Sequence, residues 1–300
     1  MDTLDALRRT RVVGEMRPRN PYLDEAGQPQ LRRSVVVFVD ILGYQGMTRR
    51  AIRSGDGQGF LRVLRETFSR AFAHLKITED LWAGEPAPWT VKTFSDNIAI
   101  GYPILHRAGE AELAVITRRL GEFQLEMTLG GFFIRGAVAV GDLYMDDQMV
   151  FGPALLDAYD AEQRLARDPR IVLTESAMQA LRDELKRYPE AGTSWHHDAI
   201  LCDADAQHFV NYLDGVVAYK REMGYSDRDA MARHREIITK RLTEFASDPP
   251  RWVKYVWAAG YHNCFCEKSP DFGDDLRVDI SDIKVRPARL SAESRNKHDV

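Results

Sequence analysis

Cysteine and long apolar runs are both scarce in this sequence. The chain has three cysteines among 300 residues, and an odd number of cysteines makes no disulfide framework. No apolar run approaches the length of a membrane span, and the N-terminal segment has none of the apolar h-region of a secretory signal. These absences predict a reduced, cytoplasmic protein that does not cross a membrane.

An excess of positive charge is also missing. Lysine and arginine number 41 against 45 aspartates and glutamates, so the net charge is -4. Broad binding to a phosphate backbone needs a basic face, and we therefore expect no nucleic-acid partner. The composition is 44% hydrophobic and 29% charged, which is typical of a globular protein with a sizeable core. The length allows one large domain or two smaller ones.

Strand-like and helix-like segments are mixed along the chain. Apolar runs and hairpin patterns predict strands near 34–40, 89–104, 131–152, 170–174 and 199–213. Helical spacing of apolar residues predicts helices near 46–77 (broken at SGDGQG), 107–128, 153–167, 176–187, 216–246 and 250–266. This mixture indicates an α+β fold, an antiparallel-rich sheet with packed helices. We expect a loosely ordered segment at 1–30, a main domain at 31–215, and a helical C-terminal extension with a polar tail at 216–300.

One carboxylate interrupts the strongest apolar run. Asp40 follows VVVFV and precedes Ile41 and Leu42, and an isolated charge in a buried strand costs on the order of several kcal/mol. One explanation is an N-cap for the next segment; the other is a partner that the fold brings close. The best candidate is Asp96, at the tip of the hairpin in KTFSDNIAI, although an aspartate there usually serves its own turn.

The two aspartates together suggest a metal site. If the hairpin lies beside the first strand, the carboxylates of Asp40 and Asp96 point into one place. Two carboxylates and a backbone carbonyl suit a hard divalent cation that keeps positions open for phosphate oxygens. A pair of such ions activates a nucleophilic oxygen and neutralises charge on a displaced phosphate.

Three segments resemble the motifs of class III nucleotidyl cyclases. The first metal-site motif of that family is similar to FVDILGYQGM, and the second is similar to VKTFSDNIAIGY. The family's stretch from an Arg-x-Gly strand through a hairpin into a helix is similar to FFIRGAVAVGDLYMDDQMVFGPALLDAYDAE. Order and spacing agree over about 35–175, roughly half the chain. The FGPALLDAYDAE segment and the C-terminal extension resemble, more narrowly, the bacterial Pycsar pyrimidine cyclases, which make cyclic UMP or cyclic CMP as an anti-phage signal.

The resemblance implies a fold, a reaction and a metal site. The region 31–215 would be the catalytic domain, on a ferredoxin-like sheet, and would act as a homodimer with composite active sites. The substrate would be a nucleoside triphosphate, whose ribose 3'-oxygen attacks the α-phosphorus and releases pyrophosphate. Asp40, Asp96 and the backbone carbonyl of Ile41 would hold two Mn2+ or Mg2+ ions.

Substrate recognition is a further implication of the resemblance. Gly43 and Tyr44, in the turn after the first strand, would offer backbone N–H groups to the triphosphate, and Phe38 would belong to the substrate site. Lys92 falls where adenylyl cyclases have a base-reading lysine. Met149 falls where they have its partner aspartate, so the acceptor that reads a purine is missing. This departure favours a base other than adenine, and the narrower resemblance implies a pyrimidine substrate, with UTP favoured over CTP.

The family's transition-state residues are also replaced. Their places are taken by Leu156 and Asp160, neither of which stabilises charge on a phosphate. Arg164, one turn further along the helix, or Arg135 on the preceding strand would then supply the missing positive charge. The alternative for Arg164 is a solvated helix face with i,i+4 charge pairs.

Other functions stay open on the sequence. A purine cyclase requires Met149 to be a core residue outside the base site. Leu156 and Asp160 favour a non-catalytic nucleotide-binding module on the same fold. An RNA-binding module on a ferredoxin-like sheet would need a basic balance and an aromatic RNP pattern, and the sequence lacks both.

Overall fold

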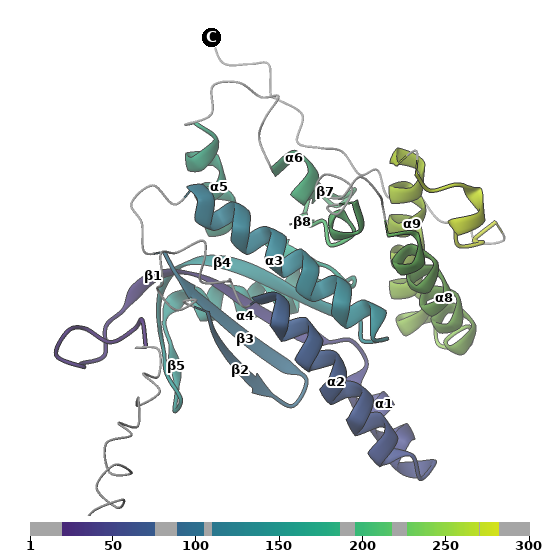
Figure 1. Cartoon of the computed structure of the whole chain (residues 1–300), viewed down its shortest axis with the longest axis horizontal. Coiled ribbons are helices and arrows are strands. Elements are labelled where there is room, and N and C mark those ends of the chain that lie inside the picture. The colour runs from purple at the N-terminus through teal and green to yellow at the C-terminus, as the bar shows by residue number, and fades with distance from the viewer. Residues whose placement is uncertain are drawn as a thin grey trace, which may run out of the picture.

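A mixed eight-stranded sheet forms the centre of the fold. The computed structural model describes residues 20–75, 89–104, 110–186, 196–217, 227–269 and 271–281. The strands lie in the order β2-β3-β1-β4-β6-β8-β7, with β5 paired to β4 (Figure 1). Their bounds are β1 Arg32–Ile41, β2 Thr90–Phe94, β3 Asn97–Pro103, β4 Ile134–Met145, β5 Val150–Phe151, β6 Ile171–Leu173, β7 Ile200–Cys202 and β8 His208–Val210. These strands pair antiparallel except for β4 with β6.

Helices cover both faces of this sheet. They are α1 Tyr44–Arg53, α2 Gly57–Leu75, α3 Glu110–Leu129, α4 Pro153–Arg164, α5 Glu175–Leu185, α6 His196–Ala199, α8 Arg228–Glu244 and α9 Pro249–Lys268. Figure 1 shows α2 and α3 in front of the sheet and α4 behind it. Because α4 connects β4 to β6, it is the crossover helix of the parallel pair. The predicted α+β class, an antiparallel-rich sheet with packed helices, is confirmed.

The central strand β1 explains why its sequence is apolar on both sides. Successive side chains of a strand point to opposite faces of the sheet. Val35, Val37 and Val39 pack into the core beneath α2 and α3. Val36 packs with residues of α4 on the opposite face, and Phe38 borders that second cluster. Asp40 follows in the same alternation as Val36 and Phe38, so its charge interrupts only the face that α4 covers.

The helical predictions agree with the structure at two places. The break in the first helical segment lies between α1 and α2, where Gly55 adopts φ 78°. The C-terminal helical extension is formed by α8 and α9. The first predicted segment of that extension began at 216, and residues 218–226 of it lie outside the described part of the chain. None of the helices that the structure describes is long and apolar enough to cross a bilayer.

The N-terminal segment reaches the sheet before β1 begins. Residues 1–19 of the predicted loosely ordered segment lie outside the described residues. Tyr22 is fully buried, and its hydroxyl donates to Ser34 Oγ at 3.1 Å. The proposed division of the chain at 30 and 215 stays a prediction.

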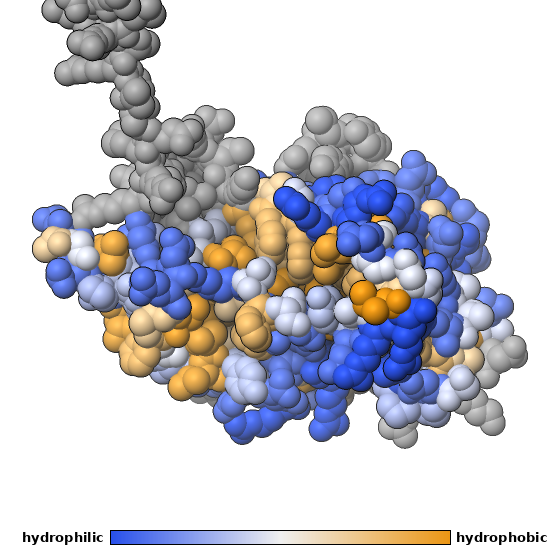
Figure 2. All heavy atoms as spheres, turned by 90° about the horizontal axis from the view of Figure 1, so that it is seen from below, coloured by the Kyte–Doolittle hydropathy of each residue, from blue (hydrophilic) through white to orange (hydrophobic). Residues whose placement is uncertain are grey.

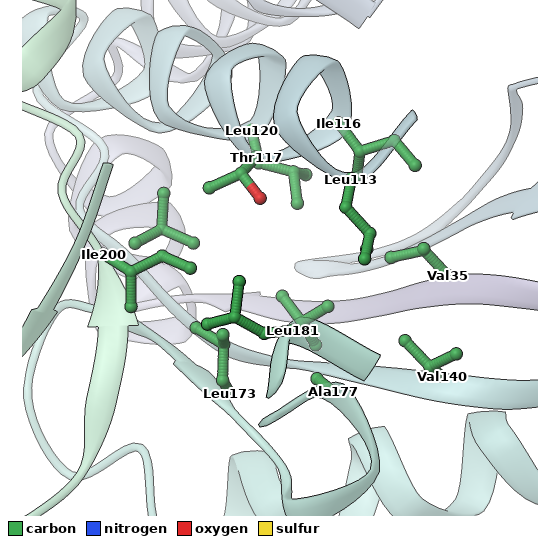
Figure 3. A pocket seen from close by; sticks show the side chains of 12 residues that line it. Val35, Leu113, Ile116, Thr117, Leu120, Val140, Leu173, Ala177, Leu181 and Ile200 are labelled. Atoms are coloured by element: carbon green, nitrogen blue, oxygen red, sulfur yellow. The ribbon is translucent and has the colours of Figure 1, made fainter. Parts of the chain in front are cut away.

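A small apolar cavity lies between α3 and the sheet (Figure 3). Leu113 and Ile116 of α3 line one side, and Val35 and Val140 of the sheet line the other. The cavity measures about 20 Å³, and Thr117 is the one polar residue among those that line it. It is too small and too apolar for a charged nucleotide. The charged residues of interest gather on the opposite face of the sheet.

Candidate metal and nucleotide site

Strand register places several predicted residues on one face of the sheet. Directly opposite residues of an antiparallel pair point to the same side. Asp40 lies opposite Arg135 on β4. Phe38, two residues back along β1, lies opposite Ala99 of β3, which in turn lies opposite Lys92 of β2. All of these side chains therefore share the face on which α4 packs.

Asp96 lies beside the end of β1, at the tip of the β2–β3 hairpin. The backbone N–H of Ile41 donates to the carbonyl oxygen of Asp96 at 3.1 Å, which holds the hairpin tip against β1. Ser95 adopts the left-handed conformation, φ 60°, so the chain reverses between β2 and β3 through two residues. The structure thus brings together the two carboxylates that the sequence singled out.

Arg135 is shared between two carboxylates. Its Nε lies 3.3 Å from Asp40 Oδ2, and its Nη2 lies 2.9 Å from Glu162 Oε1. The Glu162 side chain is fully buried, and burial raises its pKa against the pull of Arg135. Sequence reasoning gave Glu162 no role. The signal that finds it is helical spacing, because Glu162 follows Ala154, Ala158 and Ala161 on the buried side of α4.

The electrostatics and donor atoms around Asp40 fit a divalent cation. Burial, opposed by the Arg135 guanidinium and reinforced by the charges of Asp96 and Glu162, raises the pKa of Asp40 to about 6. Asp40 and Glu162 thus share the guanidinium of Arg135 while the charge of Asp96 also acts on Asp40, and a divalent cation would relieve the repulsion between these carboxylates. The carboxylates of Asp40 and Asp96 with the Ile41 carbonyl are hard oxygen donors, which Mg2+ and Mn2+ prefer. Within the described ranges no group of three or more His, Cys, Asp or Glu side chains is placed to hold a metal ion.

The turn after β1 leads into the N-terminus of α1. Gly43 is the N-cap of α1 and adopts φ 75°, a backbone conformation that residues other than glycine rarely adopt. The N–H groups in the first turn of a helix have no acceptor within the helix and attract anions. The ring of Tyr44 lies toward Phe60, with 6.5 Å between centroids. A contact of Tyr44 with a phosphate would therefore come from its backbone.

Phe38 and Lys92 form the next row of the same face. Phe38 lies between Ala99 and Ala137 on the neighbouring strands. Its ring contacts Tyr159 of α4 edge-to-face, with the centroids 5.4 Å apart. Lys92 is partly exposed on the edge strand β2. This row combines an aromatic surface with one ammonium group, which suits a nucleotide base.

Met149 lies in the reversal between β4 and β5, where it is 50% exposed. The same reversal holds Asp146, whose carboxylate interacts electrostatically with Lys92. Asp146 accepts the Tyr144 hydroxyl at 2.7 Å and the backbone N–H groups of Gln148 and Met149, both at 2.8 Å. These hydrogen bonds, led by that of Tyr144, lower the pKa of Asp146 and commit its oxygens to the turn.

Arg164 lies on another side of α4. It is two positions after Glu162 on the helix, and such residues point in nearly opposite directions. Arg164 forms an ion pair with Asp160, and its side chain is 71% exposed. It lines an open groove with Thr174 and Glu175, and neither aspartate of the metal site lines that groove. Within one chain the structure therefore shows the solvated i,i+4 pair, and a catalytic role for Arg164 stays a prediction.

Comparison with known proteins finds structural similarity only. No protein-family model matches the chain, and no curated protein matches its sequence. A similar solved structure is the guanylyl cyclase Cya2, at 11% identity and a TM-score of 0.38, with 50% of this chain and 79% of that chain covered. A second is a class III adenylyl cyclase-like ATP-binding protein from Pseudomonas aeruginosa, at 11% identity and a TM-score of 0.38, covering 55% of this chain and 38% of that chain. A third is an adenylate/guanylate cyclase/hydrolase from Silicibacter pomeroyi, at 17% identity and a TM-score of 0.35, covering 60% and 95%.

Proposed function

We propose that this chain is a metal-dependent nucleotide cyclase, a phosphorus-oxygen lyase that converts a pyrimidine nucleoside triphosphate to its 3',5'-cyclic monophosphate and pyrophosphate. One observation carries the proposal. The hydrogen bond from the Ile41 N–H to the backbone carbonyl of Asp96 holds the hairpin tip beside β1, where the charge of Asp96 acts on Asp40, at the edge of a sheet face that also presents Arg135 and Lys92.

The reaction makes one bond and breaks one. The ribose 3'-hydroxyl gives its proton to water, its oxygen bonds to the α-phosphorus, and the bond from that phosphorus to the pyrophosphate oxygen breaks. Two Mn2+ or Mg2+ ions, when bound by Asp40, Asp96 and the Ile41 carbonyl, would lower the pKa of the 3'-hydroxyl and neutralise phosphate charge. Arg135 and the N–H groups of the Gly43 turn would orient the triphosphate by charge-assisted hydrogen bonds.

The base preference rests on Lys92 and its surroundings. Because hydrogen bonds within the turn hold Asp146, and Met149 offers no acceptor, Lys92 is the polar group left to read the base. An ammonium group donates only, so it favours base edges with carbonyl oxygens. Uracil has two such oxygens and cytosine has one, which supports UTP over CTP. Adenine could accept from the ammonium group through a ring nitrogen, but its 6-amino group would lack the acceptor that the aspartate supplies in adenylyl cyclases.

A homodimer with composite sites belongs to the proposal. Large apolar side chains are exposed on the elements around this face: Phe94 82%, Met149 50%, Phe151 58%, Leu156 65% and Tyr159 46%. Figure 2, viewed from the end toward which β2 and β5 point in Figure 1, shows hydrophobic surface gathered there. Exposed apolar surface of this extent marks an interface. A second copy of the chain would cover it, so that each chain would bring Lys92 and Arg164 to the Asp40 and Asp96 of the other.

The decisive experiment is incubation of the purified protein with each of the four nucleoside triphosphates and Mn2+. We expect cyclic UMP and pyrophosphate in equal amounts, and their loss in Asp40→Asn and Asp96→Asn. Asp229→Asn, an exposed carboxylate on α8, is the matched control and should keep full activity. A cyclic purine product would overturn the base assignment. If a folded, metal-loaded dimer made no cyclic product, the proposal that the chain is a cyclase would be wrong.

Mixing two inactive variants tests the composite site. Asp40→Ala and Lys92→Ala chains should each have little activity alone. In an equal mixture half of the dimers are heterodimers with one intact site, so about a quarter of wild-type activity should return. Heterodimers confirmed by differential tagging that recover no activity would place the whole site within one chain.

A nucleotide-binding module without catalysis is the second candidate function. The exposed Leu156 and the Asp160–Arg164 ion pair favour it, because α4 presents no free cation at the places where the resembled family has its transition-state residues. This candidate predicts binding of a nucleoside triphosphate with Mg2+ and no release of pyrophosphate.

The cellular role that we propose is a cytoplasmic second messenger in anti-phage defence. Support comes from the resemblance of FGPALLDAYDAE and the helical extension to the Pycsar cyclases. Cells that carry the gene with its neighbouring genes should show fewer phage plaques, and cyclic pyrimidine nucleotide should rise after infection. The Asp40→Asn variant should abolish both effects. Protection by that variant equal to wild type would contradict the role.

A further inference from the structure

Helix α9 of the C-terminal extension lies against the strand ends that carry the site. Tyr255 and Val256 of α9 pack in one cluster with Leu42 and Phe133, and the rings of Phe133 and Tyr255 are 5.3 Å apart. Leu42 is two residues after Asp40, and Phe133 is two residues before Arg135. The Leu42 N–H donates to the Phe133 carbonyl at 2.8 Å, which joins the two ends.

Three side chains of α9 extend from α1 to the turn between β7 and β8. Arg251, Lys254 and Trp257 are three residues apart and share a side of the helix. At one end, a Cβ built on Gly46, in the first turn of α1, would lie 3.7 Å from Arg251 Nη2. At the other end, Trp257 Nε1–H donates to Asp203 Oδ2 at 2.7 Å. Lys254 therefore lies on α9 between Arg251, which is next to the first turn of α1, and Trp257, which is anchored to Asp203.

Lys254 faces the charges of the site and is paired with none of them. Its ammonium interacts with the carboxylates of Asp168, Asp40 and Glu162 and is repelled by Arg135, and burial lowers its pKa. Among the residues that the structure describes, none makes a hydrogen bond or an ion pair with Lys254. A partly buried cation next to a second cation, with its donors free, is arranged for an anionic ligand that both can share.

We propose that Lys254 binds the terminal phosphates of the triphosphate together with Arg135, so that the C-terminal extension completes the substrate site. The inference rests on the proposed nucleotide site and names a substrate-binding residue in it that the extension supplies.

A second set of contacts holds α9 in this place. Arg170 is fully buried and forms ion pairs with Asp203 and Asp205. Its guanidinium carbon lies 5.6 Å from the ring centroid of Trp257, and its carbonyl accepts the Gly136 N–H at 3.0 Å, next to Arg135. Trp257 thus holds α9 against Asp203 and Arg170, and Arg170 is in turn hydrogen-bonded to the strand that carries Arg135.

Calorimetric titration with three ligands tests the proposal in the full-length protein with Mg2+. The ligands are α,β-methylene-UTP, inorganic tripolyphosphate and UMP. In Lys254→Ala we expect binding of the first two ligands to weaken about tenfold or more and binding of UMP to stay unchanged. Lys254→Arg should restore most of the affinity, and Lys254→Met should behave like Lys254→Ala while it retains the apolar stem. Lys240→Ala, an exposed lysine on α8, is the control.

The outcomes separate this inference from the enzyme assignment. If wild-type protein makes cyclic product and Lys254→Ala binds tripolyphosphate as tightly as wild type, the inference is wrong and the enzyme stands. If wild-type protein binds tripolyphosphate through Lys254 without making product, the enzyme assignment is wrong and the inference stands. Equal weakening of all three ligands with a lowered melting temperature in Lys254→Met would make Lys254 a structural counter-charge and overturn the inference.

Discussion

A chain of buried hydrogen bonds crosses the C-terminal extension through two histidines. His234 of α8 and His262 of α9 lie with their Nδ1 atoms 2.8 Å apart. His262 Nε2 lies 2.7 Å from the Leu276 carbonyl, which only accepts, so this nitrogen carries a proton. His262 Nδ1 then accepts from His234 Nδ1–H, and His234 Nε2 accepts from the Tyr212 hydroxyl at 3.0 Å. All three bonds are made with both rings neutral, so the folded chain buries no charge on either histidine.

Acid should therefore destabilise the extension, by an amount that follows from the pKa of His262. Burial lowers this pKa from 6.5 to about 4. Below pH 6.5 the unfolded chain binds the proton first, so the stability from the neutral ring is complete above 6.5 and is lost between 6.5 and 4. The difference corresponds to about 3 kcal/mol, of which about 2 kcal/mol is lost at pH 5. Burial lowers the pKa of His234 as well, and the loss deepens in the same direction.

Two buried carboxylates change the stability in the opposite direction as the pH falls. Burial raises the pKa of both Asp40 and Asp168 to about 6. Their folded forms take up protons first, so they add stability as the pH falls below about 6. The quantity to measure is therefore the pH dependence of the wild type minus that of His262→Gln. The glutamine amide keeps a donor for Leu276 and an acceptor for His234, and it does not titrate.

Urea unfolding followed by tryptophan fluorescence at pH 7.5 and pH 5 gives each free energy of unfolding. Between these values we expect the wild type to lose about 2 kcal/mol more than His262→Gln. His208→Gln, a partly exposed histidine on β8, is the control and should follow the wild type. Equal pH dependence in the wild type and in His262→Gln would refute the assignment of neutral rings.

The site itself offers three more tests. Asp40→Asn and Asp96→Asn should each lower kcat by at least about a hundredfold while the circular dichroism spectrum stays unchanged. Pyrophosphate release at the wild-type rate would exclude the proposal that these two residues hold the metal ions. Arg135→Met should lower the free energy of unfolding in urea by about 3 kcal/mol, because Glu162 is left buried and unpaired. Adding Glu162→Leu should recover most of that stability but no activity. A single variant as stable as the wild type would contradict the Arg135–Glu162 pairing. Gly43→Ala should lower the stability by about 1 kcal/mol in thermal melting, because φ is 75° at this position, and Gly43→Asn should lower it less. A larger loss in Gly43→Asn than in Gly43→Ala would contradict the left-handed turn.

The sequence is sufficient to predict that Asp40 and Asp96 meet. Alternation along β1 determines the face of Asp40, and the Ser95–Asp96 turn determines where the hairpin reverses. Both patterns depend on neighbours in the chain, so they can be read without knowledge of the rest of the fold. Lys92 and Phe38 follow from the same alternation once β2, β3 and β1 are known to be adjacent.

Glu162 and Lys254 are beyond that kind of prediction. Each lies on a helix whose own sequence pattern says which side is buried and not what it is buried against. Glu162 contacts Arg135 because α4, which connects β4 to β6, packs across the sheet face that carries Arg135. Lys254 reaches the site because α9 packs on Leu42 and Phe133. These partners depend on how whole elements pack, and packing sums many weak contacts from distant parts of the chain.

By itself, the sequence determined the elements of this protein, the α+β class and the carboxylate pair at the end of the first strand. Local periodicity and turn chemistry carry that information, because each acts within a few residues. Only the tertiary structure decided that Arg135 is shared with a buried Glu162, that Arg164 lies on another side of α4, and that α9 brings Lys254 toward the site. Burial and the electrostatic field at a residue are properties of the assembled fold, since they depend on every element packed around it.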